Sequence, residues 1–589
     1  MKLKTLKVEN FRGIQGGQNI LEFDENNIVF IFGKNNIGKS SILHAYKYFS
    51  ATNQQAAITD FHNHNTKKPI CIEAVFTKED SDANNFNAKG LNKWVSPSGE
   101  IRIRKTWLAV GLPANKETFD PLTETFTPNG FGGMEPILTS ALPNIIFIEA
   151  MPSTKTLIDW LEKEIKTRLL KKLKETHKDE YDAALISIKK LQDRVESDEY
   201  LGKIKTGANK YFAKTFPDLE LKICSTPNKE ADLSKAFEKD FSITIGKKIG
   251  NDPILANAIE TLEELELIGG ENIGNDAPPS HREFELHGHG LIRQAIINIL
   301  GLCKDAKADQ KQIILFEEPE LYLHPSNKRR FRDTLYEIAE QDNYQIICVS
   351  HDPQLIDLSR PHTSLVRFVR NEDGSTTLHQ AGNNIFHKDE ETKDRIQMLN
   401  RFNPHVCEAF FADEVVLVEG DTEAIVVREL LHKHYKEKEI FVLNTGSKNN
   451  IPFFIKALGH FRIKQHIIHD TDERYLYEKG SVKKNADGSN TKNSAWALNE
   501  SIWDQIIATN VANPIACRYL SIRNFEHSHG YKPDPNLGKP LSAHKFAQTI
   551  DITNESIAIV KILKQITGEL PVTNIPCQVH IEATVVEPF

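Results

Sequence analysis

The sequence lacks any apolar run approaching the roughly 20 residues that a membrane-spanning helix requires, so no transmembrane segment is expected. The N-terminus alternates like a β-strand and has no apolar signal-peptide core, so we expect a cytoplasmic protein. The seven cysteines are scattered without a CxxC pair, which argues against a zinc site or a disulfide framework. The formal net charge of -8 gives no whole-protein basic signature for nucleic acid, although a local basic groove is compatible with it.

The length predicts several domains, because 589 residues are too many for one hydrophobic core. Strand-like patterns dominate residues 1–153 and return over residues 242–395, whereas residues 154–241 carry a Lys-, Glu- and Leu-rich helical pattern. Residues 396–589 alternate strand and helix. We therefore expect an α/β protein with one domain in two halves, a helical insertion, and a C-terminal α/β domain. The insertion is either a dimerisation arm or a helical subdomain packed on its own chain.

Residues 33–40 read GKNNIGKS and match the phosphate-loop pattern GxxxxGK[ST]. An apolar strand pattern, Ile28–Phe32, precedes the loop and a helical pattern follows it, which is the context that a phosphate loop needs. We expect Lys39 to reach the β- and γ-phosphates of ATP and Ser40 to ligate its Mg²⁺. The other candidate nucleotide contacts in this loop are Gly33, Asn35, Asn36, Gly38 and Ser41.

Two further apolar strand patterns end in polar residues that suit an ATPase. The strand Ile313–Phe316 ends in Glu317 and Glu318, and we expect the first to hold the Mg²⁺ shell and the second to polarise the attacking water. The strand Gln345–Val349 ends in Ser-His-Asp, where His351 is a candidate switch near the γ-phosphate. Taken alone, the two glutamates could be a solvated strand end, but the order of the three motifs weakens that interpretation.

Four carboxylates follow two strand patterns in the C-terminal part. Glu419 and Glu423 flank the start of a helix after the strand Glu414–Val418, and Asp470 and Asp472 end the strand His466–His469. The ends of adjacent parallel strands form the active sites of α/β folds. Clustered hard oxygen ligands favour Mg²⁺ or Mn²⁺, and a pair of ions could cleave a phosphodiester.

Two other residues could complete this site. Glu526 is a further candidate carboxylate, and Lys539 could stabilise charge on the phosphate. Asp421 is interpreted as an outward-facing loop carboxylate, and His469 as a packed strand residue and not a ligand.

The opening VENFRG, the phosphate loop, FEEPELYLHP and SHD resemble ABC ATPases of the recombination-repair and chromosome-maintenance type. The segment Gly288–Gln294 lies where that group carries its dimer signature, although LSGGQ is absent, and Glu317 replaces the common Asp. The resemblance implies at least a homodimer in which the partner's signature segment completes the ATP site.

The pattern EGxxE followed by DxD resembles a TOPRIM domain, and its fusion to an ABC ATPase resembles the overcoming-lysogenization-defect (OLD) nuclease family. The resemblance implies a catalytic lysine, for which Lys539 is the first choice and Lys545 the competitor. It also implies a homodimer or homotetramer and a DNA substrate. It further implies a role in phage defence, in which the partner is a helicase, a retron reverse transcriptase with its DNA–RNA product, or none. The metal ligands that it implies are Glu419, Glu423, Asp470, Asp472 and Glu526.

These observations predict an α/β chain in which an ABC-type ATPase with an inserted helical arm precedes a TOPRIM domain. The leading hypothesis is a nucleotide-regulated, divalent-metal-dependent endonuclease or nickase acting on DNA. The alternative is a DNA-repair or chromosome-associated ATPase whose TOPRIM domain binds nucleic acid without cleaving it. A topoisomerase would need a tyrosine-bearing cleavage domain, for which the residues after position 400 leave no room.

Overall fold

The computed structural model does not describe every part of the chain. All of the signature segment Gly288–Gln294 except Leu291, and most of the helical insertion 154–241, lie outside the described residues, as does Asn36. The described residues are 1–23, 26–35, 37–82, 86, 91–128, 142–150, 199–225, 241–247, 281–283, 291, 311–321, 323–341, 343–358, 364–381, 404–511 and 514–572.

An antiparallel sheet with the order β2-β1-β4-β5-β6-β7 contains the N-terminal strand. Apolar and polar residues alternate along β1 and β5, so that one face of this sheet is buried. That face packs on helix α1 (Lys39–Ser50). The strands are β1 (Lys2–Glu9), β2 (Ile20–Glu22), β4 (Ile70–Thr77), β5 (Glu100–Trp107), β6 (Asn115–Asp120) and β7 (Thr125–Pro128).

A second sheet, with the order β15-β14-β3-β13-β12-β8, carries the predicted ATPase motifs. All neighbouring strands are parallel except β14 and β15, and β3 and β13 are buried along their whole length. Continuous burial follows from the cover of α1 on one face and α11 (Pro325–Ala339) on the other. The strands are β3 (Ile28–Phe32), β8 (Asn144–Ile148), β12 (Gln312–Glu317), β13 (Tyr344–Val349), β14 (Leu365–Arg370) and β15 (Thr376–Gln380).

The C-terminal sheet has the order β17-β16-β18-β21, and all its strands are parallel. Its two faces are covered by different helices, which pack into separate hydrophobic clusters. The strands are β16 (Glu414–Val418), β17 (Ile440–Asn444), β18 (Lys464–Asp470) and β21 (Ala516–Ser521). On one face lie α13 (Asp421–His434), α17 (Gly538–Thr549) and α18 (Ala558–Thr567), and on the other α14 (Ile451–His460) and α15 (Ser494–Asn510).

The remaining elements lie outside these three sheets. A helix and a three-stranded sheet comprise α7 (Glu199–Thr215), β9 (Leu219–Ser225), β10 (Phe241–Lys247) and β11 (His281–Glu283). A short helix and a hairpin in the C-terminal part are α16 (Phe525–His529), β19 (Tyr477–Glu478) and β20 (Ser481–Val482). The short 3-10 helices are η1 (Ile58–Asp60), η2 (His62–His64), η3 (Asp80–Asp82), η4 (Leu91–Trp94), η9 (Pro353–Leu355), η12 (Pro404–Phe411) and η13 (Lys448–Asn450).

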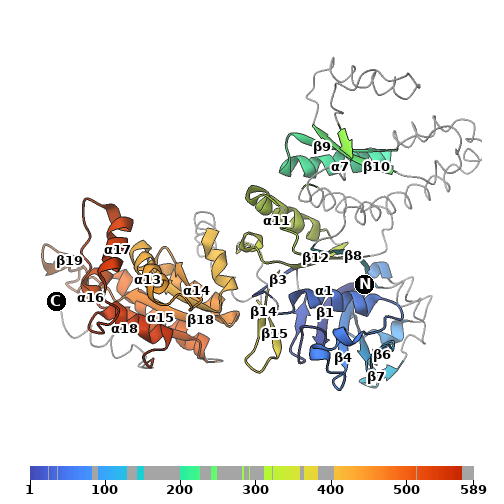
Figure 1. Ribbon diagram of the computed structural model, residues 1–589, viewed down its shortest axis with the longest axis horizontal. Helices are drawn as coiled ribbons and strands as arrows, with labels where there is room; N and C mark the ends of the chain where they lie inside the picture. Colours follow the sequence, from blue (N-terminus) through green and yellow to red (C-terminus); the bar gives the residue numbers. More distant parts are fainter. Residues whose placement is uncertain are drawn as a thin grey trace, which may run out of the picture.

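The ATPase sheet and the C-terminal sheet share one hydrophobic core, and their elements meet near β3 and β14 (Figure 1). The ring of Phe32, the last residue of β3, lies 5.3 Å from that of Phe461 and 5.5 Å from that of Phe411, centroid to centroid. The guanidinium of Arg367 on β14 is 2% exposed and donates to the backbone carbonyls of Phe461 (2.9 Å) and Ala412 (2.8 Å). Segments next to the C-terminal sheet, at η12 and after α14, therefore pack directly on the strand that leads into the phosphate loop.

The structure confirms the apolar strands predicted from the sequence, with ends that differ by no more than a few residues. It also confirms that His469 is packed, since this side chain is buried inside β18. Asp421 differs from the expectation, because it is the first residue of α13 and not part of a loop. No helix among the described residues is long and apolar enough to cross a membrane.

Candidate functional site

The phosphate loop has the backbone geometry that its glycines predict. Gly33 and Gly38 have φ angles of 142° and 101°, a region that favours glycine, and α1 begins directly after the second of them. A side chain on Gly13 would put its Cβ 2.6 Å from the Cα of Gly38. The glycine of the VENFRG segment therefore allows the chain after the N-terminal strand to pack closely against the phosphate loop at Gly38.

Lys39 is the buried cation of this loop. Its ammonium is 4% exposed and donates to the backbone carbonyls of Gly33 (2.9 Å) and Lys34 (2.5 Å). Burial lowers its pKa to about 8, against the opposing effect of the nearby carboxylates Glu318 and Glu320. Because its hydrogen-bond partners are neutral carbonyls, its charge is available to an incoming phosphate.

The second half of the nucleotide site lies at the ends of β12 and β13. Glu318 has a left-handed backbone (φ 44°), and its Oε1 lies 3.3 Å from Nε2 of His351. Burial, with a contribution from Lys39, lowers the pKa of His351 to about 4, so this imidazole is neutral at pH 7 and the contact is not an ion pair. Glu317 faces another way, since its Oε2 accepts a hydrogen bond from Ala150 N (3.3 Å).

A cavity of about 510 Å³ brings several predicted nucleotide contacts together. Glu320, to which the sequence assigned no role, is buried here and accepts hydrogen bonds from Ser350 Oγ and His351 N, both at 2.9 Å. The sequence feature that could have indicated this role is the position of Glu320 two residues after the acidic pair Glu317 and Glu318. Ser41, another predicted nucleotide contact, accepts a hydrogen bond from Gly13 N through its Oγ (3.4 Å). The cavity is lined by Asn35, Glu318, Glu320, Leu321, His351, Asp352 and Pro353.

The four predicted carboxylates of the C-terminal sheet come together at the ends of β16 and β18. Asp470 N donates to Glu419 Oε1 at 2.6 Å, and both side chains are largely buried. Burial and then the charges of Glu419, Glu423 and Asp472 raise the pKa of Asp470 to about 8. Burial likewise raises the pKa of Glu419 to about 7, and burial raises that of Glu423. Ionised together, these side chains would repel one another.

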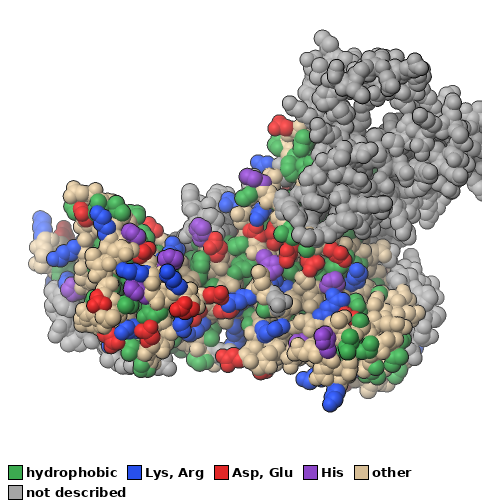
Figure 2. Space-filling model, viewed as in Figure 1, with side chains coloured by type: hydrophobic (Ala, Val, Ile, Leu, Met, Phe, Trp, Pro, Cys, Tyr) green, Lys and Arg blue, Asp and Glu red, His purple; other side chains and the backbone are tan. Residues whose placement is uncertain are grey.

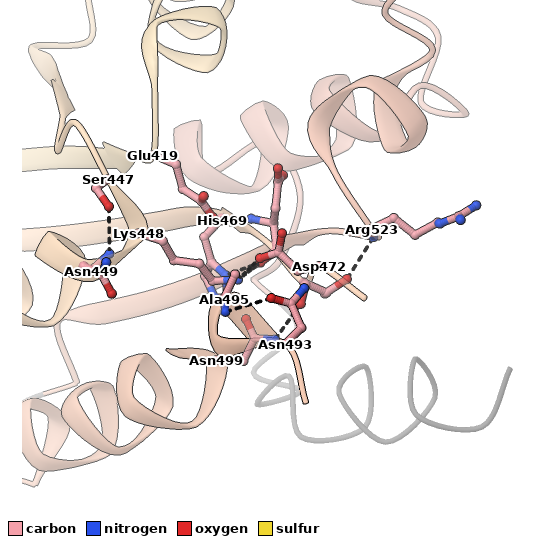
Figure 3. Close-up of polar contacts among 12 residues, drawn as sticks. Glu419, Ser447, Lys448, Asn449, His469, Asp472, Asn493, Ala495, Asn499 and Arg523 are labelled. Carbon is pink, nitrogen blue, oxygen red and sulfur yellow. Dashed lines mark hydrogen bonds and ion pairs between the residues drawn. The ribbon is translucent and has the colours of Figure 1, made fainter. Parts of the chain in front are cut away.

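A lysine that the sequence did not single out lies among these carboxylates. Lys448 is 5% exposed, and its ammonium donates to Asp472 Oδ2 (2.6 Å) and to the backbone carbonyl of Asp470 (2.5 Å). Figure 3 shows its side chain extending toward Asp472. It comes from the turn after β17, a strand parallel to β16, so its place at a strand end was the signal that could have found it.

Glu526 also lies beside the cluster. It raises the pKa of Glu423 through its charge, after the larger effect of burial, and it shares a cavity of about 630 Å³ with Asp472 and Arg523. Asp472 and Arg523 both have left-handed backbones (φ 60° and 64°), and Asp472 N donates to the carbonyl of Arg523 at 2.9 Å. Non-glycine residues held in this way are frequent at functional sites.

The two predicted catalytic lysines are further from this arrangement. Lys539 and Lys545 are exposed residues of α17, and neither is among the principal charges that shift the pKa values of Glu419, Glu423 and Asp470. Among the described residues, Lys448 is the lysine that contacts the carboxylates.

The carboxylate cluster fits a divalent cation in charge and ligand type, because a cation would relieve the repulsion that raises these pKa values. It is not a preformed cage: within the described part of the chain, no three His, Cys, Asp or Glu side chains converge closely enough to hold a metal ion. One oxygen of Glu419 accepts from Asp470 N, and one oxygen of Asp472 accepts from Lys448. Metal ligation would therefore require small rearrangements of these side chains.

Comparison with protein families gives one match for the part with the phosphate loop and another for the part with the carboxylate cluster. Residues 1–243 and 218–356 match the family described as AAA ATPase domain, and residues 410–472 match the family described as overcoming lysogenization defect protein-like, TOPRIM domain. The chain belongs to the AAA ATPase family and carries an OLD-like TOPRIM domain. The ATPase match contains the phosphate loop and both later strand ends, and the TOPRIM match contains all four clustered carboxylates.

Curated relatives of this ATPase–TOPRIM protein are nucleases. The Old nuclease of Escherichia phage P2 is 24% identical over 80% of this chain and 77% of its own length. The endonuclease GajA of Bacillus cereus is 24% identical over 76% of this chain and 71% of its own. The OLD nuclease of Thermus scotoductus is 27% identical over 27% of this chain and 30% of its own. These matches support a nuclease with an ATPase domain, and such domains in general bind ATP and divalent metal ions.

Among solved structures, an Smc head bound to the C-winged helix domain of ScpA covers 65% of this chain and 98% of its own. Its TM-score is 0.42 and its sequence identity is 14%.

Proposed function

We propose that this chain is a nucleotide-regulated, divalent-metal-dependent endonuclease or nickase that acts on DNA. The observation that carries the proposal is the group of carboxylates at the ends of two parallel strands, in which the largely buried Glu419 and Asp470 lie beside the partly exposed Asp472. Their like charges would be relieved by a bound cation. The nuclease relatives, one named an endonuclease, support the same reaction class.

The metal ligands would be the carboxylates of this cluster, and the ions would be Mg²⁺ or Mn²⁺, in a pair. Bound divalent ions would activate water and stabilise the leaving oxygen of a phosphodiester. The chain itself would hold Asp470 against Glu419 through the 2.6 Å backbone hydrogen bond. The proposed ligands are Glu419, Glu423, Asp470, Asp472 and Glu526.

The DNA strand would lie over the cavity that borders the carboxylates. Arg523, His527 and Lys532 line this cavity together with Asp472, so cationic and neutral donors lie next to the proposed ligands. On the visible face in Figure 2, basic side chains are interspersed with acidic ones. The proposed DNA contact is accordingly a local surface, in which Lys539 and Lys545 of the neighbouring α17 are the candidate phosphate-stabilising lysines.

ATP would bind with Mg²⁺ at the phosphate loop, where Lys39 would meet the β- and γ-phosphates and Ser40 the ion. Glu317 would support that ion, Glu318 would orient water, and His351 would sense the γ-phosphate. The other proposed contacts are Gly33, Asn35, Asn36, Gly38 and Ser41.

Nucleotide control would pass through an ionic bridge between the two domains. Lys34, the second residue of the phosphate loop, pairs with Asp413 (2.8 Å) and Glu439 (2.9 Å) of the TOPRIM domain. Asp413 also accepts from the buried Arg367 at 2.7 Å. Strand β16 begins directly after Asp413 and ends directly before Glu419. A shift of the phosphate loop on nucleotide binding would therefore act on the strand that carries a proposed metal ligand.

Higher-order assembly and biological role belong to the same proposal. A homodimer or homotetramer would complete the ATP site, and light scattering with and without ATP would measure it; a monomer under both conditions would contradict it. The relative GajA suggests a role in phage defence. The partner in that role would be a helicase, a retron reverse transcriptase with its DNA–RNA product, or none.

The test is cleavage of plasmid and single-stranded DNA by the full chain with Mg²⁺ or Mn²⁺, with and without ATP. Asp470→Asn should lower cleavage by at least about a hundredfold, because it removes a charged ligand. Asp487→Asn is the matched control, since Asp487 is fully exposed in the turn after β20 and its hydrogen bonds go to Ser489 of the same turn. Equal cleavage by the parent and Asp470→Asn would overturn the metal-site assignment.

The second candidate is a DNA-repair or chromosome-associated ATPase whose TOPRIM domain binds nucleic acid without cleaving it, and the match of more than half of the chain to an AAA ATPase domain is compatible with it. DNA binding without cleavage under every metal condition would support this second function and contradict the first.

A further inference from the structure

The turn that carries Lys448 is fixed to the strand that carries Glu419. Thr445 N and Oγ1 both donate to the carbonyl of Val418, at 3.0 and 2.9 Å, and Asn450 Nδ2 donates to Thr445 O at 2.8 Å. Ser447 caps the following 3-10 turn by accepting from Asn449 N. The base of the lysine side chain is therefore held at a set distance from the end of β16.

Burial of a lysine is costly unless its charge is compensated, and here the compensation is specific. The ammonium contacts one carboxylate oxygen of Asp472 and the backbone oxygen of Asp470, which are the two aspartates of the DxD motif. The loop of Asp472 is itself anchored, because Asn499 Nδ2, a buried group on α15, donates to Thr471 O at 2.7 Å. Figure 3 shows the lysine, Asp472 and Asn499 gathered at this strand end.

The charges of the cluster explain what such a lysine would do. Glu419, Glu423 and Asp472 act on Asp470 as like charges, and Lys448 is the opposing cation. The lysine therefore supplies part of the positive charge that the carboxylates need. It also donates to an oxygen of Asp472 that could otherwise bind a metal ion. This is consistent with the finding that, in the described residues, no three acidic, His or Cys side chains converge closely enough to hold an ion.

We propose that Lys448 is a positioning residue and the built-in cation of the carboxylate cluster: it orients Asp472 for the reaction and weakens the binding of divalent ions at that carboxylate. The inference rests on the proposed function, because it takes Asp472 as a metal ligand. It separates two properties that a purely structural lysine would change together, namely metal affinity and cleavage rate.

The experiment measures Mn²⁺ binding to the full chain by calorimetry, beside cleavage of plasmid DNA at saturating Mn²⁺. Lys448→Met keeps an unbranched side chain that is one atom shorter and removes the charge. We expect Mn²⁺ affinity to rise by about tenfold, because a nearby like charge is lost, while cleavage falls by about tenfold because Asp472 loses its anchor. Lys448→Arg keeps the charge and should keep Mn²⁺ affinity near that of the parent. Lys484→Met, a change of an exposed lysine just after β20, is the control and should alter neither property.

A double-mutant cycle with Asp472→Asn tests whether the lysine acts through that carboxylate. The gain in Mn²⁺ affinity from Lys448→Met should shrink to less than about twofold when Asp472 is already neutral. Unchanged or weaker Mn²⁺ binding in Lys448→Met, with its thermal unfolding intact, would overturn the inference. The same result in Lys448→Gln would overturn it if the methionine variant does not fold.

The outcomes also separate this inference from the proposed function. If the parent binds Mn²⁺ and cleaves DNA but Lys448→Met matches it in both, only the role of the lysine fails. If the parent neither binds Mn²⁺ nor cleaves DNA, the proposed function fails, and the inference fails with it.

Discussion

The phosphate loop and the carboxylate cluster each bury one lysine, and they use it in opposite ways. Lys39 is 4% exposed and is held by neutral backbone carbonyls, so its positive charge is uncompensated by direct contact. Lys448 is 5% exposed and donates to the carboxylate of Asp472, so its charge is compensated by direct contact. The cluster around it contains more carboxylates than lysines. One region is therefore prepared for an anion and the other for a cation. The difference shows that the partner of a buried charge, more than its burial, determines which ligand a site attracts.

The largest expected effect separates chemistry from binding within the phosphate-loop region. Glu318→Gln should keep ATP affinity and slow ATP hydrolysis by about a hundredfold, because the amide cannot accept a proton from water. Filter binding of ATP and phosphate release measure the two properties. A variant that hydrolyses ATP at the parent rate would show that another group activates the water.

Removing the lysine of the phosphate loop should weaken anion binding alone. Lys39→Ala should lower ATP affinity by at least about tenfold, since a charge-assisted contact with phosphate is lost. Mn²⁺ affinity at the carboxylate cluster should not change. ATP and Mn²⁺ titrations on the same preparation check both statements, and equal ATP affinity in the variant and the parent would contradict the assignment of the loop.

The two candidate phosphate-stabilising lysines on α17 sharpen the comparison, because neither belongs to the charged contacts of the cluster. Lys539→Ala should lower DNA cleavage by about tenfold with Mn²⁺ affinity nearly unchanged, whereas Lys545→Ala should cleave like the parent. Cleavage rates at saturating Mn²⁺ decide between them. Reversed results would keep the metal site and exchange the lysines.

The excess negative charge of the cluster should appear in the pH dependence of stability. In metal-free protein, Asp470 and Glu419 keep protons up to pKa values of about 8 and about 7, whereas an unfolded carboxyl releases its proton near pH 4. Because the folded state binds more protons in that window, the free energy of unfolding should fall as pH rises from about 4 to about 8. A divalent ion should reverse the loss.

Thermal unfolding of chelator-treated protein measures this effect. Asp470→Asn removes the group with the larger shift, so its melting temperature should rise relative to the parent as pH increases through this window. Fully exposed Asp487→Asn serves as the control. Parallel curves for the parent and Asp470→Asn would show that the repulsion is relieved by other means.

The smallest expected effect concerns the bridge between the two regions. Lys34→Met removes the cation that joins Asp413 and Glu439 and leaves Asp413 paired with the buried Arg367, and exposed ion pairs such as those of Lys34 contribute at most about 1 kcal/mol to stability. The variant should therefore fold and bind ATP like the parent, but ATP should change its DNA cleavage less. A nucleotide response equal to that of the parent would exclude the bridge as the coupling route.

Much of both sites could be predicted from local sequence, because local patterns fix the backbone there. The phosphate loop follows from the spacing of Gly33, Gly38 and Lys39 between a buried strand and a helix. Glu419 and Asp470 follow from apolar strands that end in acidic residues. Neighbours in sequence are neighbours in space at such strand ends, so the motif alone indicates the geometry.

Tertiary structure alone decided which distant segments meet. Lys448 reaches the DxD motif because β17 pairs with β16 and β16 with β18, and that strand order depends on packing between residues far apart in the chain. The Lys34 bridge arises because Phe32 packs against the TOPRIM domain. Local sequence indicated most of the groups proposed to bear the chemistry, but not Lys448 or Glu320. The fold determined which charges they face, since these contacts are made between elements that no local pattern connects.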